Sequence, residues 1–203
     1  MARRNDHSRE ELQSMALTAA ERLLDEQGAA ALSARKVAAE IGYSAGALYL
    51  VFTNRDDLCW QLNARTLEKL LLALREVSCR QPIQCLQQYA ETYLAFASRW
   101  SNRWSLLFEH RSPDGTEAPV WLSEKIELLF RCLEQPLSGL FPHARSAEIG
   151  LMARTLWSGV HGVTILQLRD KLFISQDASA EKMLDGLITA YVAGIQHNRE
   201  VAV

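Results

Sequence analysis

Apolar residues recur along most of the chain at the spacing of an α-helix. The first run places four apolar residues three or four positions apart, on one face of a helix. They are Leu12, Ala16, Ala19 and Leu23. Gly28 follows the run and suits the left-handed conformation that often ends a helix. The pattern predicts a helix over about residues 9–27.

Further runs of the same kind predict an all-α fold of about nine helices. Only ten Gly and five Pro occur in 203 residues, which favours helices over a turn-rich β fold. Ser33 and Ser44 are suitable N-caps, and Asn54 or Asp56 can cap the long helix that follows. Pro136 is expected to end a helix. The expected helices cover about 34–41, 45–51, 56–78, 82–96, 104–108, 120–135, 145–170 and 179–198.

Residues 33–52 meet three steric requirements of a helix-turn-helix at once. Ala38 is small where two helices cross closely, and Gly42 tolerates the positive φ of the turn. Leu48 returns a large apolar group to the core. The spacing therefore predicts a helix-turn-helix, in which the start of the second helix enters the major groove of double-stranded DNA.

The outer side of this segment supplies the candidate DNA contacts. Small residues let the backbone approach the duplex, and Ala47 offers apolar contact with a thymine methyl group. Ser33, Tyr49 and Arg55 are placed to contact phosphates, and Arg35 a phosphate or a base edge. The full set is Ser33, Arg35, Tyr43, Ser44, Ala45, Gly46, Ala47, Tyr49 and Arg55. The alternative is an ordinary three-helix corner with solvated polar groups.

The charge balance gives DNA binding no direct support. Residues 1–66 hold eight Lys or Arg and nine Asp or Glu, and the whole chain has a formal net charge of −2. Nucleic-acid-binding domains are usually basic, so the positive groups must gather on one face. Arg3, Arg4 and Arg9 are expected to contribute through a flexible basic arm over residues 1–8.

Residues 9–67 resemble the N-terminal domain of the tetracycline-repressor (TetR) family. The likeness is carried by the run LSARKVAAEIGYSAGALYLVF at 32–52, followed by Arg55 and Leu58. The resemblance implies that 44–49 form the recognition helix and that Tyr49 and Arg55 hold phosphates. Four positions depart from the residues frequent in the family: Tyr43, Ala47, Val51 and Thr53. These departures concern the operator sequence and not the docking mode.

The same resemblance implies a domain organisation and a function. A three-helix DNA-binding domain over 9–55 would be fused through a long helix to a larger helical domain over 56–203, which binds ligand and dimerises. The run LWSGVHGV at 156–163 resembles a Trp…His-Gly motif of one branch of these C-terminal domains. The expected function is a homodimeric, cytoplasmic repressor, released from a pseudo-palindromic operator by a small, largely apolar effector. The rivals are an enzyme and a helical binding module that does not bind DNA.

The last two expected helices are candidates for the dimer interface. Several glycines lie within the helix over 145–170, where each costs about 1 kcal/mol relative to Ala, so close approach by a helix or a ligand is expected. Two helices from each subunit would then form a four-helix interface. The candidate residues are Leu151, Leu168, Leu184, Leu187, Ile188, Tyr191 and Ile195. The alternative is a helix pair within one chain.

Aromatic residues are the candidates for the effector pocket, because ligand sites are mostly apolar with a few placed polar groups. The candidates are Trp100, Trp104, Phe108, Trp121, Trp157 and His161. His161, Arg103 or Arg154 would fix a polar or anionic head. The alternative is that these aromatic residues belong to the core.

Other features exclude several classes of function. The four cysteines, Cys59, Cys79, Cys85 and Cys132, match no metal-ligand pattern and are expected as reduced thiols, with redox sensing as the alternative. No apolar run reaches the roughly 20 residues of a membrane span, and the polar start lacks the apolar core of a signal peptide. No phosphate loop or nucleophile elbow appears, so neither an enzyme nor a cofactor or metal site is expected.

Overall fold

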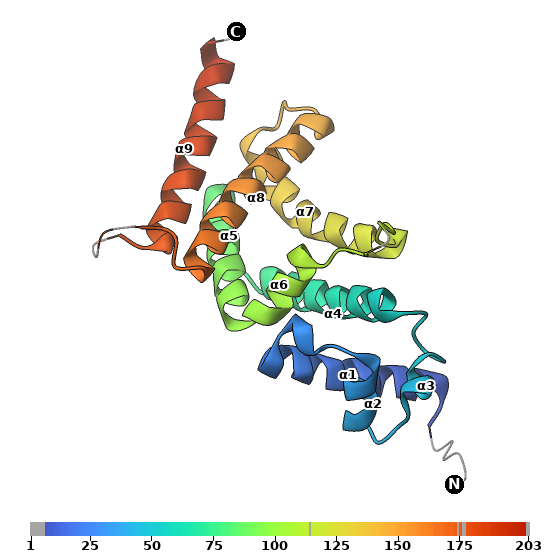
Figure 1. Cartoon of the computed structure of the whole chain (residues 1–203). Helices are drawn as coiled ribbons and strands as arrows, with labels where there is room; N and C mark the ends of the chain where they lie inside the picture. The colour runs from blue at the N-terminus through green and yellow to red at the C-terminus, as the bar shows by residue number, and fades with distance from the viewer. Residues whose placement is uncertain (1–6, 114, 174, 176–177, 202–203) are drawn as a thin grey trace. The chain divides into compact units, whose positions relative to one another are not determined.

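The computed structural model describes residues 7–113, 115–173, 175 and 178–201. Regular secondary structure in these ranges is helical throughout, which confirms the all-α class (Figure 1). The helices are α1 Arg9–Gln27, η1 Ala29–Ala31, α2 Ala34–Glu40, α3 Ala45–Leu48, α4 Arg55–Arg75, α5 Pro82–Arg99, α6 Ser101–Glu109, α7 Val120–Leu140, α8 Ser146–Leu168 and α9 Ala180–Val201. None of the helices in the described ranges combines the length and apolarity that a bilayer span requires.

The chain forms two compact units. The first consists of Met1–Glu68 and Trp100–Lys125, and the second of Lys69–Arg99 and Ile126–Val203. A single boundary after residue 55 was expected, whereas the segment containing α6 packs with the N-terminal helices. Helices α4 and α7 each contribute residues to both units.

The core of the first unit forms around α1. Ser8 accepts a hydrogen bond from the Glu11 amide, and Glu11 accepts one from the Ser8 amide, so the first turn of the helix is capped on both sides. The four apolar residues that predicted this helix are all buried. Gly28 has φ 74° and ψ 177°, a positive-φ conformation that favours glycine but lies outside the left-handed helical region, and the chain continues at once into η1.

A buried ion pair fastens α6 to α1. Arg103 donates from Nε and Nη2 to the two carboxylate oxygens of Asp25, at 2.6 and 2.5 Å, and its Nη1 lies 3.1 Å from Glu21. Asn102 donates to the backbone oxygen of Asp25 at 3.0 Å. The hydrogen bonds from Arg103 to Asp25 raise the pKa of this 5 % exposed arginine. Periodicity cannot reveal this contact, since its partners lie 78 residues apart.

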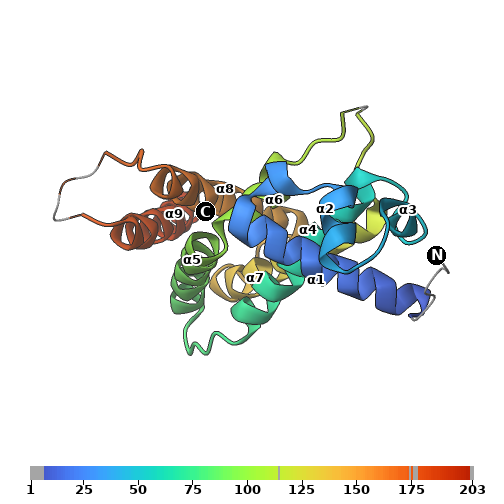
Figure 2. The same ribbon diagram turned by 60° about the horizontal axis from the view of Figure 1, so that its bottom comes forward.

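In the second unit, α5, α8 and α9 pack side by side (Figure 2). Gly159 lies where α8 meets α9, and a Cβ there would come within 2.8 Å of Leu187. Gln87 of α5 donates to Asp185 of α9. The glycines of α8 were expected to allow another helix to approach closely. At Gly159 this happens, and the approaching helix, α9, belongs to the same chain.

One helix boundary differs from the prediction because tertiary packing outweighs local preference. Helix α7 continues through Pro136 to Leu140, although a proline in a helix interior normally costs about 3 kcal/mol. Leu137 and Phe141, just beyond the proline, are 0 and 4 % exposed. Burying these two side chains offsets the lost backbone hydrogen bond.

The expectation of four reduced thiols was wrong. Cys79 and Cys85 form a disulfide, with their Cα atoms 5.3 Å apart, across the turn between α4 and α5. The spacing of these residues fits no zinc motif, but a turn brings them within disulfide reach. Cys59 and Cys132 are free thiols, and burial raises the pKa of both, that of Cys59 to about 11.

Candidate DNA interface and ligand cavity

Helices α2 and α3 form the turn that the sequence predicted. Ala38 and Leu48 are 1 and 2 % exposed, and Gly42 has φ 75°. The amide of Tyr43 donates to the Ala38 oxygen at 2.9 Å, which closes the turn. Helix α3 ends at Leu48 and not at Val51. The small residue, the glycine and the leucine therefore occupy the positions that their spacing predicted.

Capping fixes the start of both helices. Ser33 accepts a hydrogen bond from the Lys36 amide, and Ser44 accepts one from the Ala47 amide, both at 3.3 Å. Each serine satisfies one of the amides that a helix start leaves without an intrahelical partner. The expected phosphate contact of Ser33 therefore has to come from a side chain that already caps a helix.

The outer side of α2 and α3 exposes most of the candidate DNA contacts. Tyr49 is 61 % exposed, and Arg35, Ser44 and Gly46 are exposed as well. Neighbouring Leu50, which the sequence analysis did not single out, is 62 % exposed. A large apolar side chain beside the expected reading head is a further candidate for contact with DNA.

Four of the candidates, Ser33 among them, are drawn partly into the unit. Ala45, Ala47 and Tyr43 are half-buried, and the latter two pack against the core. The hydroxyl of Tyr43 lies 2.7 Å from Nδ1 of His7. Of the predicted basic arm, residues 1–6, with Arg3 and Arg4, lie outside the described residues. Arg9 opens α1 and is exposed.

Arg55 is exposed but contacts the backbone of its own unit. Its Nε donates to the Leu32 oxygen at 3.3 Å, and its Nη2 donates to the Ala29 oxygen at 3.4 Å. The side chain therefore links the start of α4 to the segment before α2. Phosphate contact would use the remaining donors of the guanidinium group.

The carboxylates of the first unit explain why its net charge is uninformative. Most of them hold the fold: Glu11 caps α1, and the hydrogen bonds it accepts from Ser8 lower its pKa. Asp57 accepts from the Thr53 amide at 2.8 Å. Asp56 accepts from Ser112 and lies 2.9 Å from Nε2 of His110. Carboxylates held in such contacts do not prevent the outer face of the unit from being basic. A count of charges along the sequence cannot distinguish these carboxylates from exposed ones.

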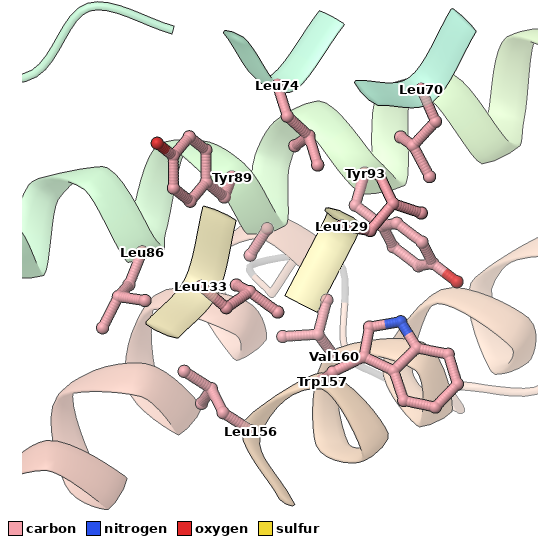
Figure 3. Close-up of a pocket in the computed structure, with 11 residues that line it drawn as sticks. Leu70, Leu74, Leu86, Tyr89, Tyr93, Leu129, Leu133, Leu156, Trp157 and Val160 are labelled. Carbon is pink, nitrogen blue, oxygen red and sulfur yellow. The ribbon is translucent and has the colours of Figure 1, made fainter. Parts of the chain in front are cut away.

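The second unit contains an apolar cavity of about 50 Å³ (Figure 3). Side chains from α4, α5, α7 and α8 line it, most of them leucines. They are Leu70, Leu74, Leu86, Tyr89, Ala90, Tyr93, Leu129, Leu133, Leu156, Trp157 and Val160. Of these residues only Trp157 was predicted to line a pocket, because a leucine that lines a cavity has the same helical spacing as one that fills a core.

Polar groups gather at one end of this cavity. The Tyr93 hydroxyl lies 2.8 Å from Nδ1 of His161, and the rings of Trp157 and His161 are 5.1 Å apart. The Tyr93 hydroxyl and the Trp157 indole lie at the same end of the cavity in Figure 3, with Tyr89 at the other. Burial lowers the pKa of His161. An apolar cavity with a hydroxyl and an imidazole at one end is suited to a small, largely apolar ligand.

The predicted pocket residues are divided between the two units. Trp157 lines the cavity, and His161 reaches it through Tyr93. Trp100, Trp104, Phe108 and Trp121 belong to the first unit. There Trp104 is 2 % exposed beside Phe108, Trp121 is 38 % exposed, and Trp100 stacks on Arg103. Helical spacing could not assign an aromatic residue to a unit.

Neither of the two arginines expected to hold an effector head lines the cavity. Arg103 is the buried partner of Asp25. Arg154 pairs with Glu127 at 2.7 Å and with Glu134 at 3.4 Å, and these bonds raise its pKa. No cluster of His, Cys, Asp and Glu suited to a metal ion occurs in the described ranges.

Two of the candidate dimer residues turn inward. Leu184 and Ile188 are 1 and 0 % exposed, so these side chains pack within their own chain and the expectation for them was wrong. Leu151 is 68 % exposed. The others are half-buried: Leu168, Leu187, Tyr191 and Ile195. The apolar positions of α9 face the core of its own unit, and periodicity alone could not separate the two faces.

A helix-turn-helix with an exposed second helix, in an all-helical chain, defines a DNA-binding protein of the helix-turn-helix class. Residues 86–188 match the family described as tetracyclin repressor-like, C-terminal domain, and residues 16–60 match bacterial regulatory proteins of the tetR family. The chain therefore belongs to the TetR family and is a DNA-binding transcriptional regulator. A comparison with curated proteins gives no match.

Solved structures share the fold over nearly their whole length. A Rhodococcus sp. RHA1 protein of unknown function is 20 % identical, with a TM-score of 0.72, over 95 % of this chain and 98 % of that one. BioQ, crystallised with its natural double-stranded DNA operator, is 18 % identical, with a TM-score of 0.66 and coverages of 89 and 98 %. NalD, the secondary repressor of the MexAB-OprM multidrug efflux pump of Pseudomonas aeruginosa, is 19 % identical, with a TM-score of 0.59 and coverages of 90 and 97 %.

Proposed function

We propose that this regulator is a repressor, which a small, largely apolar effector releases from its operator. The observation that carries the proposal is the course of α4. In the first unit, Arg55 at its start binds the backbone just before α2, and Leu58 lies in the same core cluster as Leu48. In the second unit, Leu70 and Leu74 line the cavity. NalD, a repressor of similar fold, and BioQ, bound to an operator, support the proposal.

Operator binding would place one α3 segment of each subunit in the major groove of each half-site. Half-sites of such dimers lie about 34–36 Å apart, or a multiple of this distance. Tyr49 and Arg55 would contact phosphates, together with amides at the starts of α2 and α3. Arg35, Gly46 and Ala47 would face base edges or the neighbouring backbone, as would Tyr43, Ser44 and Ala45.

The second copy would dock on the outer faces of α8 and α9. Gly162, Gly186 and Gly194 lie in these helices, and a Cβ on any of them would meet no other atom within 4 Å in the described chain. Unlike Gly159, these glycines have no close neighbour within the chain that accounts for them. Leu151 and the half-buried residues on α8 and α9 border the same faces.

Release would follow from enlarging the cavity. A volume of about 50 Å³ is far below the roughly 300–1,000 Å³ of ordinary ligand sites, so a bound effector must push α4, α5, α7 and α8 apart. Because α4 contributes residues to both units, a displacement of α4 would also move its residues in the first unit. Couplings of about 1–3 kcal/mol are typical of such linkage and suffice to weaken operator binding.

The DNA-binding part is tested by gel shift with the DNA upstream of the protein's own gene. We expect salt-sensitive, sequence-specific binding, and Arg55→Ala should reduce the slope of log affinity against log salt by about one. Arg145→Gln, a charge removed from the exposed start of α8, should leave the slope unchanged. Equal slopes for Arg55→Ala and the wild type would refute the phosphate role.

The effector part is tested with a cavity-filling variant. Ala90 is 4 % exposed and lines the cavity, so Ala90→Leu would fill the space without touching the helix-turn-helix. The variant should bind the operator as the wild type does and fail to be released by small apolar compounds that release the wild type. Unimpaired release of Ala90→Leu would contradict the cavity as the effector site.

A further inference from the structure

A second hollow, lined by both polar and apolar side chains, shares Tyr89 with the apolar cavity of the second unit. It has a volume of about 790 Å³, and the turn between α4 and α5, the start of α5 and one face of α7 line it. Three arginines line it, and no aspartate or glutamate does: Arg75, Arg80 and Arg131. We refer to this hollow as the arginine groove.

The three arginines differ from Arg145, Arg154 and Arg199 of the same unit, which have acidic partners. Arg145 and Arg199 pair with Glu148, and Arg154 pairs with Glu127 and Glu134. Within the described residues, Arg75, Arg80 and Arg131 form no ion pair. The three arginines are exposed, so solvent screens their mutual repulsion, and no acidic side chain in the lining competes with an incoming anion for them. The groove therefore has the charge pattern of an anion site.

Tyr89 connects the groove to the apolar cavity. It lines both spaces, together with residues of α5 and α7 on either side. In Figure 3 its ring stands at the cavity wall, and its hydroxyl points away from the Trp157 end. Burial, and to a lesser degree the nearby thiol of Cys132, raises the pKa of this hydroxyl, so it remains a neutral hydrogen-bond donor beside the groove.

We propose that the arginine groove binds the oxyanion head of the effector, whose apolar part enters the cavity past Tyr89. The effector is thus an amphipathic anion, with a carboxylate or a phosphate attached to a compact apolar tail. Guanidinium groups bind both oxyanions through paired, charge-assisted hydrogen bonds. This assignment rests on the proposed function, since it names the class of molecule that acts on the same cavity.

The test compares ligands that share a tail and differ in the head. Titration calorimetry on the full-length protein, with its disulfide intact, would use octanoate, monooctyl phosphate, the neutral 1-octanol and inorganic phosphate. We expect at least one octyl oxyanion to bind tenfold or more tightly than both 1-octanol and inorganic phosphate. The preferred head distinguishes a carboxylate from a phosphate effector.

Titrations of arginine variants then show where the oxyanion head of the ligand binds. Each of Arg75→Gln, Arg80→Gln and Arg131→Gln should weaken the oxyanion about tenfold and leave 1-octanol unchanged, because each removes one charged hydrogen-bond donor group. Arg111→Gln, an exposed arginine of the first unit, is the matched control and should have no effect. Circular dichroism verifies that the variants remain folded.

Three results would overturn the assignment: no binding of either octyl oxyanion, equal binding of 1-octanol and the oxyanions, or unchanged affinity in all three groove variants. Operator release, measured by gel shift on the same samples, tests the proposed function separately. An oxyanion that binds through the arginines without releasing DNA would support the groove and contradict the effector role. Release by 1-octanol that ignores the arginines would support the effector role and overturn the groove.

Discussion

The two units of this regulator use polar groups in opposite ways. In the first unit, carboxylates cap helices and hold Arg103 and His110, and the core contains Leu24 and Ala20 at 1 and 0 % exposure. In the second unit, an apolar cavity lies within the helices and three arginines stand without acidic partners. The first unit commits carboxylates to internal contacts, whereas the second unit, within the described residues, leaves three arginines without an ion pair around a groove.

The difference follows from what each site has to do. Reading DNA requires a short helix to be held at a fixed position on the surface, so the residues behind it must be closely packed. Binding a ligand that changes the fold requires an interior with room to rearrange. The same substitution made once in each unit should therefore change the stability of the two units by different amounts.

The largest effect is expected behind α3. Leu48→Ala should lower the free energy of unfolding by about 4 kcal/mol, because it removes a fully buried side chain and leaves a cavity. Operator binding should be lost with it. Leu50→Ala, two residues on and 62 % exposed, should change the stability by less than about 0.5 kcal/mol. Urea unfolding of both variants measures the contrast, and equal losses would mean that α3 is not held through Leu48.

The second prediction enlarges one alanine in each unit. Ala38→Leu should cost about 3 kcal/mol, since the crossing of α2 and α3 has no room for the side chain. Ala90→Leu, the same change beside the cavity, should cost little or stabilise the protein. Thermal unfolding of the two variants measures the two changes in stability. A comparable loss in both would show that the second unit is packed as tightly as the first.

The helix-turn-helix could be predicted from the sequence because its constraints are local. Ala38, Gly42 and Leu48 lie within eleven residues, and backbone geometry ties their spacing to one arrangement. The helix over 9–27 was predictable for the same reason, and its bounds agree with α1.

The apolar cavity could not be predicted, because nothing in a leucine indicates whether the space beside it is filled. Arg103 looked like a ligand contact, and only the folded chain brings it to Asp25. Pro136 ends helices by local rules, yet the burial of Leu137 carries α7 past it. In each case a contact between residues far apart in the sequence determines the local structure, and the sequence pattern does not reveal that contact.

Removal of the disulfide should act on the second unit alone. Cys79→Ser with Cys85→Ser should lower the free energy of unfolding by about 2 kcal/mol, as expected for a short closed loop. Arg80 lies within that loop, so the variant should also bind octyl oxyanions more weakly than the wild type. Cys132→Ser, which alters a free thiol of the same groove, is the control. In urea unfolding, adding a reductant should shift the midpoint of the wild type but not that of the double variant.

The smallest expected effect concerns pH and arises at the polar end of the cavity. Burial lowers the pKa of His161 in the folded protein, so the unfolded chain binds a proton that the folded chain resists. The contribution of neutral His161 to stability is complete above the ordinary histidine pKa of about 6.5 and is lost as the pH falls below it. His161→Gln should therefore flatten the decrease in melting temperature between about pH 7.5 and 5.5, whereas substitution of the exposed His197 should not. If the two variants lose stability in parallel with the wild type, the cavity end is already open to water, and the second unit is looser than its burial indicates.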